Sequence, residues 1–123
     1  MSNDTEVSIH NDEFTIAKEQ TDGISGTTTI HLRKPFTYEE HTFEELTFDW
    51  NRLTGEDALA IEDEVQALNK AVIVPVFSGE FLVRMAARAC VERIGQDVLR
   101  ALPIADFNKV RNAARSFLLK SEL

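Results

Sequence analysis

The apolar residues of this chain change their spacing near residue 50, and that change most constrains the fold. Before it, residues 27–50 are dense in β-branched and aromatic residues, and Thr28, Ile30 and Leu32 alternate with more polar neighbours, which is typical of strands. After it, apolar residues recur every three or four positions, which is the spacing of helices. This order predicts an α+β fold: an N-terminal β-hairpin or small antiparallel sheet followed by a three- to four-helix C-terminal bundle.

The strand region is expected to form a hairpin. Glu39 and Glu40 are polar residues between two runs of strand-forming residues, so we place them at the tip, with Phe36 and Tyr38 facing Phe43 across the turn. The second strand is irregular, because Leu46, Phe48 and Trp50 share one parity and Phe43 has the other. Keeping all of them on the core side requires an extra residue, and we predict a β-bulge near Glu44–Glu45. Pro35 cannot donate to a ladder and should lie at a strand end or an edge.

A first helix is expected over roughly residues 55–70. Thr54 and Asp57 have the spacing of an N-cap and the third helical residue. Pro75 disfavours helical geometry at the residue before it, so residues 71–77 should form a short apolar connection. The apolar stripe of this helix comprises Ala58, Ile61, Val65, Leu68 and Val72.

A second helix is expected from Gly79 to about Ile94, with Ser78 as its cap. It is apolar on well over half of its circumference and leaves only a narrow polar strip that contains Arg84 and Arg88. A helix of this kind is either buried between layers or covered by a partner.

The chain closes on another amphipathic helix. Gly95 is able to end the second helix, residues 96–102 are able to add a short turn, and Pro103 suits the first position of the last helix. Whether its stripe packs inward or binds a partner stays open; the stripe comprises Phe107, Val110, Ala114, Phe117 and Leu118.

Residues 27–123 are expected to form a single domain behind a flexible tail over residues 1–26, whose polar composition buries too little apolar surface to offset the entropy of ordering. The chain has 13 basic and 21 acidic residues, and its net charge of -8 disfavours nucleic acid or an anionic membrane as a partner. No apolar run is long enough to span a membrane. The lone Cys90 cannot form an internal disulfide, which suits a reducing cytoplasm, and we expect its side chain to be buried in the fold.

No constellation of residues points to catalysis. The three histidines lack metal-ligand spacing, and Glu39, Glu40 and His41 fit a solvated turn better than an acid–base cluster. We therefore expect no enzymatic activity, no cofactor and no metal. Two arginine pairs are each one turn apart, Arg84 with Arg88 and Arg111 with Arg115, and each either grips an anion or pairs with the acidic first helix.

The remaining feature is apolar surface on the second helix, the connection before it and the last helix. It either packs on the hairpin or forms an interaction surface, and the sequence leaves both alternatives open. The candidate partner-binding residues are Val76, Phe77, Phe81, Met85, Phe117 and Leu118.

Two stretches resemble a known family. "TTIHLRKPFTYEEHTFEELTFD" is similar to the opening of small tail assembly chaperones from long-tailed bacteriophages, and "LTGEDALAIE" stands where that family begins a helix. "LPIADFNKVRNAARSFL" resembles the family's ending, and the resemblance covers roughly residues 28–119. Glu40 stands where many relatives have a turn glycine. The matching positions are Ile30, Leu32, Lys34, Pro35, Phe36, Phe43, Glu45 and Leu46, then Leu102, Pro103, Asp106, Val110, Phe117 and Leu118.

The resemblance implies a non-catalytic assembly factor that acts in the host cytoplasm. Such a factor coats the helical, aggregation-prone tape measure protein, keeps it soluble, helps to recruit tail tube subunits and often forms homo-oligomers. Two alternatives stay open from the residues: a minor structural tail or capsid component, and a small regulatory adaptor that binds a protein partner through the C-terminal helix.

Overall fold

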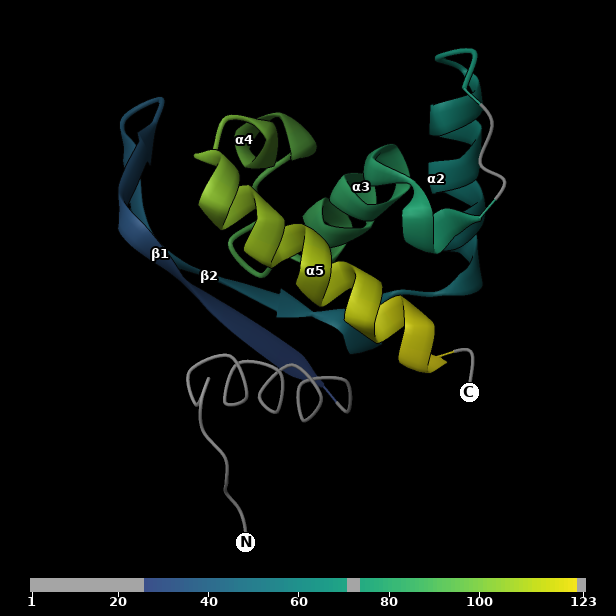
Figure 1. Cartoon of the computed structure of the whole chain (residues 1–123), viewed down its shortest axis with the longest axis horizontal. Coiled ribbons are helices and arrows are strands. Elements are labelled where there is room, and N and C mark those ends of the chain that lie inside the picture. The colour runs from purple at the N-terminus through teal and green to yellow at the C-terminus, as the bar shows by residue number, and fades with distance from the viewer. Residues whose placement is uncertain (1–25, 71–73, 122–123) are drawn as a thin grey trace, which may run out of the picture.

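A computed structural model describes residues 26–70 and 74–121, so the expected tail lies outside the described residues except for Gly26. The two strands form one antiparallel sheet, and the helices gather on one face of it (Figure 1). The α+β prediction of a hairpin followed by a helical bundle is therefore confirmed, with four helices in the described part. In chain order the elements are β1 (Thr27–Tyr38), β2 (His41–Asp49), the 3₁₀ turn η1 (Trp50–Arg52), α2 (Gly55–Gln66), the 3₁₀ turn η2 (Pro75–Phe77), α3 (Gly79–Ala89), α4 (Gln96–Arg100) and α5 (Ile104–Ser121).

The hairpin turns at Glu39 and Glu40, as the sequence predicts. Tyr38 pairs with His41 on either side of the turn. Both glutamates have positive φ, 48° and 74°, which is the combination of a type I′ turn and matches the twist of the strands. Two glutamates thus adopt a turn that usually contains Asn and Gly, against their backbone preference.

The predicted irregularity exists, but most of its unpaired residues lie in the other strand. On β1 the pairing jumps from His31 to Phe36, whereas the paired residues on β2, Glu45 and Phe43, are only two apart. Four residues of β1 therefore face a single residue of β2. The prediction of one extra residue in β2 near Glu44–Glu45 was wrong about the strand, because parity along one strand does not reveal the length of its partner.

A contact from α5 accounts for this departure of β1 from the ladder. Asp106, in the first turn of α5, is 1% exposed, and its Oδ1 accepts a hydrogen bond from the Arg33 backbone N–H at 3.1 Å. Lys109 Nζ lies 3.8 Å from the same carboxylate and donates to the His31 carbonyl at 3.2 Å. The helix, and not β2, thus satisfies backbone groups in this part of β1.

α2 begins at the predicted Thr54 N-cap and ends at Gln66, four residues before the expected end. A turn follows in which Asn69 has a φ of 62°, a left-handed conformation that ends helices. The expected stripe is therefore only partly buried: Ile61 and Val65 are buried, Ala58 is half-buried, Leu68 is 45% exposed, and Val72 lies outside the described residues.

α3 ends at Ala89, five residues before the expected end at Ile94. Cys90 is extended and bridges to β2, and the Val91 N–H donates to the Thr47 carbonyl at 2.8 Å. Pairing with the sheet edge ends the helix, and the spacing of apolar residues carries no sign of it. The prediction that Gly95 ends α3 was wrong, since Gly95 caps the start of α4. The predicted short turn exists as α4, and Pro103 precedes the first residue of α5, Ile104, and does not occupy that position.

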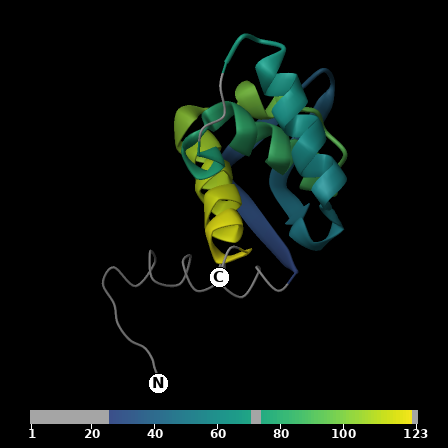
Figure 2. The same cartoon turned by 90° about the vertical axis from the view of Figure 1, so that its right-hand side faces the viewer.

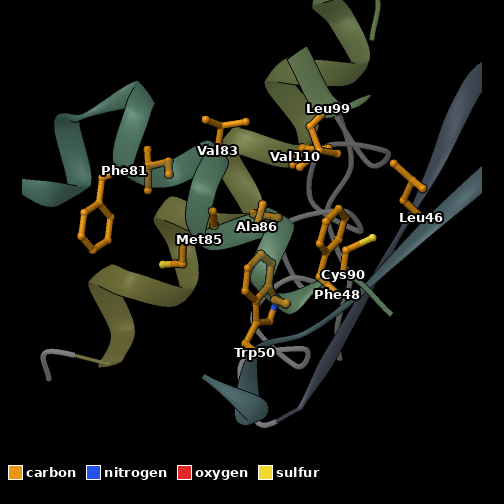
Figure 3. Packing of buried hydrophobic residues seen from close by; sticks show 14 of the residues in the cluster. Leu46, Phe48, Trp50, Phe81, Val83, Met85, Ala86, Cys90, Leu99 and Val110 are labelled. Atoms are coloured by element: carbon orange, nitrogen blue, oxygen red, sulfur yellow. The ribbon is translucent and has the colours of Figure 1, made fainter. Parts of the chain in front are cut away.

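The core is centred on α3. Figure 3 shows its side chains meeting Phe48 and Trp50 from the end of the hairpin, with Val110 of α5 and Leu99 of α4 on the other side. The broad apolar surface of α3 is therefore buried between layers of the same chain, one of the two alternatives the sequence left open. The buried residues of α3 are Phe81, Leu82, Val83, Met85, Ala86 and Ala89.

Candidate partner-binding groove

An apolar groove of about 240 Å³ lies between α2, α3 and the C-terminal end of α5. α3 supplies the floor, and α2 and α5 stand on opposite sides of it (Figure 2). The volume is below the roughly 300–1,000 Å³ of pockets that enclose small ligands, so the groove suits one or two side chains of a larger partner. Its lining residues are Leu53, Thr54, Asp57, Ala58, Ile61, Phe81, Met85, Phe117, Leu118 and Ser121.

The floor follows from the cap of α3. The Ser78 hydroxyl accepts a hydrogen bond from the Phe81 N–H at 3.1 Å, which fixes Phe81 in the first turn of the helix. Met85 follows four residues later, so both side chains point to the same side of α3. Figure 3 shows them projecting toward the ribbon of α5. A thioether beside an aromatic ring makes a floor that adapts to different shapes.

The wall from α5 is anchored to the core by an aromatic stack. The ring of Phe117 lies 5.6 Å from that of Trp50, and Trp50 lies 5.4 Å from Phe48 on its other side. The Trp50 Nε1–H donates to the buried Thr28 hydroxyl at 2.9 Å. Phe117 and Leu118 remain half-buried, in contrast to Val110, which is fully buried about two turns earlier. The end of α5 is thus held in place and still open to the groove.

The wall from α2 is held by hydrogen bonds and ion pairs. Asp57 accepts from the Thr54 backbone N–H at 2.8 Å and from Arg88 at 2.9 Å. These donors, the Thr54 N–H first, hold the pKa of Asp57 below its usual value. Arg88 also pairs with Glu64 at 3.0 Å, and Arg84 pairs with Glu64 at 3.1 Å. The two arginines lower the pKa of Glu64, with the Arg88 hydrogen bond as the larger cause.

These ion pairs decide between the two hypotheses for Arg84 and Arg88, anion binding and pairing with the acidic helix. A second cavity, of about 270 Å³, lies beside the two arginines and is also lined by Glu64. Glu80 adds another partner, because its carboxylate lies 3.4 Å from Arg84 and 2.6 Å from Arg100. Arg84 and Arg88 are therefore paired within the fold, as the alternative of pairing with the acidic first helix predicts, and they present no free charge pair to an anion. Arg111 and Arg115 do not pair with that helix: Arg111 donates to Asn108 at 2.9 Å, and Arg115 donates to the Val76 carbonyl.

Four of the six candidate residues come together in the groove: Phe81, Met85, Phe117 and Leu118. Val76 and Phe77 do not line it. Val76 is buried and its carbonyl accepts from Arg115 Nε at 2.8 Å, whereas Phe77 is 77% exposed. The sequence missed the contribution of α2, from which Ala58 and Ile61 enter the groove. The apolar spacing of those two residues was visible, but the approach of α2 to α5 was not.

The polar candidates contribute nothing to the groove. Glu39, Glu40 and His41 are exposed at the hairpin tip, as expected of a solvated turn. Cys90 is buried, and this burial raises the pKa of its thiol to about 11. Over residues 26–70 and 74–121, no group of three or more His, Cys, Asp and Glu side chains is placed to hold a metal ion.

None of the known protein families, curated proteins or solved structures compared with the chain matches it. In the described part of the chain, no helix combines the length and apolar character that crossing a membrane requires.

Proposed function

We propose that this protein is a non-catalytic tail assembly chaperone of a long-tailed bacteriophage. It binds the helical tape measure protein in the host cytoplasm, keeps it soluble during tail assembly and helps to recruit tail tube subunits. The resemblance of residues 28–119 to this family supplies the identity of the client.

The observation that carries the proposal is the apolar groove at the end of α5. A groove between two helices suits an amphipathic helix, which inserts side chains spaced three or four residues apart. Phe117 and Leu118, which match the family's ending, line the groove together with Met85 and Phe81. A tape measure protein offers many apolar helical segments, and an adaptable floor tolerates different ones.

The proposal is tested by co-expressing the chain with the tape measure protein of the phage that encodes it. The soluble fraction of the client should rise in the presence of the chain. Leu118→Gln should reduce this effect, because it places an amide in the groove. Leu119→Gln is the matched control: Leu119 is the next residue of α5, is 47% exposed and does not line the groove.

A client that stays equally insoluble with and without the wild-type chain would contradict the proposal. Finding the chain in purified mature particles would instead favour a structural tail or capsid component, because a chaperone leaves before the particle is complete.

A further inference from the structure

We propose that the groove selects helices whose apolar anchor residues are flanked by Lys or Arg. The inference rests on the proposed function and adds the charge of the partner. It follows from the distribution of charge around an otherwise apolar groove.

The α2 wall carries five acidic residues and no basic residue between Gly55 and Gln66. Asp57 and Glu64 are neutralised by Arg84 and Arg88. The other three acids have no ion pair with any residue in the described ranges: Glu56, Glu62 and Asp63.

One of these acids, Glu62, is placed next to the groove by its spacing from a lining residue. Glu62 follows Ala58 by four residues, so it lies one turn further along on the same side of α2 as a lining residue. A cationic side chain on a helix seated between Ala58 and Leu118 would come within reach of Glu62. Glu56 and Asp63 add to the negative potential around this wall without touching the groove.

The α5 wall adds negative potential of a second kind. Leu118 and Ser121 line the groove from the last turn of α5, where the carbonyl ends of the peptide dipoles amount to about half a negative charge. Lys120 is the basic residue of that turn. Along α2 and the last turn of α5, three unneutralised acids and a helix C-terminus thus stand against Lys120, whereas Arg52 and Arg115 donate to the carbonyls of Cys90 and Val76. The balance on these two walls favours a cationic partner.

The walls also favour a helical partner segment over an extended one. Both walls are helices whose backbone groups are engaged within the helices, so an extended segment finds no free ladder to join. The protein's own residues 1–25 are a poor occupant on charge, because they contain six acidic residues against the single Lys18. The complementary occupant is a basic amphipathic helix from another protein.

The test uses two fluorescein-labelled synthetic helices of about 18 residues, long enough to be helical in water. They share the same leucine face, and one carries Lys and the other Glu beside it. Binding to the full chain is followed by fluorescence anisotropy. The Lys peptide should bind at least about fivefold more tightly at low salt, and the difference should shrink to less than about twofold at 1 M salt, where the Debye length is about 3 Å.

Two sets of variants assign the effect to the groove and to its charge. Leu118→Gln should weaken both peptides, with Leu119→Gln as its control. A triple variant, Glu56→Gln with Glu62→Gln and Asp63→Asn, should keep affinity for the leucine face and lose the preference for Lys. A triple replacement by Gln of the exposed hairpin glutamates Glu39, Glu40 and Glu44 removes the same charge and should keep the preference.

Equal affinities for the two peptides would overturn the inference and leave the groove as a docking site. Binding that is insensitive to Leu118→Gln would overturn it by placing the contact elsewhere, and so would self-association through the groove, seen as a concentration-dependent mass that Leu118→Gln abolishes. Failure of the proposed function is read separately, from the solubility of the co-expressed tape measure protein.

Discussion

Replacing Thr28 by Val is expected to destabilise the fold, because it removes the hydroxyl that accepts a hydrogen bond from the Trp50 indole. The Thr28 hydroxyl accepts from Trp50 Nε1–H at 2.9 Å, and Trp50 is 1% exposed between two stacked rings. The indole N–H has no other role than donor, so the substitution leaves it buried and unpaired. The expected loss is about 1–3 kcal/mol, because an unsatisfied buried donor retains its full desolvation penalty. Val keeps the β-branched shape and suits a strand, so little else changes.

The loss is measured by urea unfolding followed by far-ultraviolet circular dichroism, a signal that also serves variants lacking Trp50, the single tryptophan of the chain. At a slope of about 1–3 kcal/mol per molar urea, the midpoint should fall by roughly 1 M. Thr29→Val is the matched control. Its hydroxyl lies 3.1 Å from that of Thr47 in an exposed position, and a surface substitution of this kind stays within about 0.5 kcal/mol.

A double-mutant cycle isolates the hydrogen bond from packing. Trp50→Phe removes the donor and leaves the Thr28 hydroxyl without its partner, and the double variant removes both polar groups. Replacing both partners by apolar groups is far less costly than the sum of the single losses. The double variant should therefore be more stable than additivity predicts, by about 1 kcal/mol or more. Strict additivity, or a Thr28→Val variant as stable as the wild type, would refute the reasoning.

Three further predictions follow from the ion pairs, the thiol and the cap of α2. Arg100, with smaller contributions from Lys70 and Arg84, lowers the pKa of Glu80 to about 2 from its usual 4.5. The ionised Glu80 therefore stabilises the fold fully above pH 4.5, and this stabilisation is lost as the pH falls toward 2. The free energy of unfolding of Glu80→Gln should accordingly depend less steeply on pH between 4.5 and 2 in an acid titration. Cys90 should react with a thiol reagent at pH 8 only after unfolding in urea, because burial raises its pKa to about 11, and rapid stoichiometric labelling of the native protein would contradict its burial. Thr54→Ala should lower the free energy of unfolding by about 1 kcal/mol through loss of the N-cap residue, measured by thermal melting followed by circular dichroism; an unchanged melting temperature would show that Asp57 alone secures the start of α2.

The fold follows from the sequence where its signals are local. The hairpin turn at Glu39–Glu40, the cap of α2 at Thr54 and the cap of α3 at Ser78 are all where residue type and spacing placed them. Each depends on contacts within three or four residues. Side-chain caps and turn residues act over that distance, so they can be predicted from the amino-acid sequence.

The errors occur where a distant segment decides the local structure. α3 stops at Ala89 because the next residues pair with the edge of β2, and β1 leaves its ladder where Asp106 of α5 accepts from Arg33. Both partners are more than 40 residues away in the chain. The apolar surface of α3 had the same ambiguity, because periodicity measures how much of a helix is apolar and not what covers it.

The groove was predictable in part for the same reason. Phe81 with Met85, and Phe117 with Leu118, were recognisable as two apolar pairs on two helices, but their meeting depends on the crossing of α3 and α5. Phe77 is a candidate residue that the sequence wrongly grouped with the groove. It shares the character of those residues, and the fold leaves it exposed and away from the groove.

The two edges of the hairpin have a consequence for how copies of this protein meet one another. A two-stranded sheet exposes two rows of backbone groups that invite strand-to-strand growth. On the β2 side, Val91 donates to the Thr47 carbonyl and the Glu92 carboxylate accepts from the Thr47 N–H. On the β1 side, Pro35 has no N–H to offer, and the α5 contacts occupy Arg33 and His31. Strand-to-strand growth is thereby obstructed at Thr47 on one edge and over residues 31–35 on the other, which disfavours fibres built from copies of this chain.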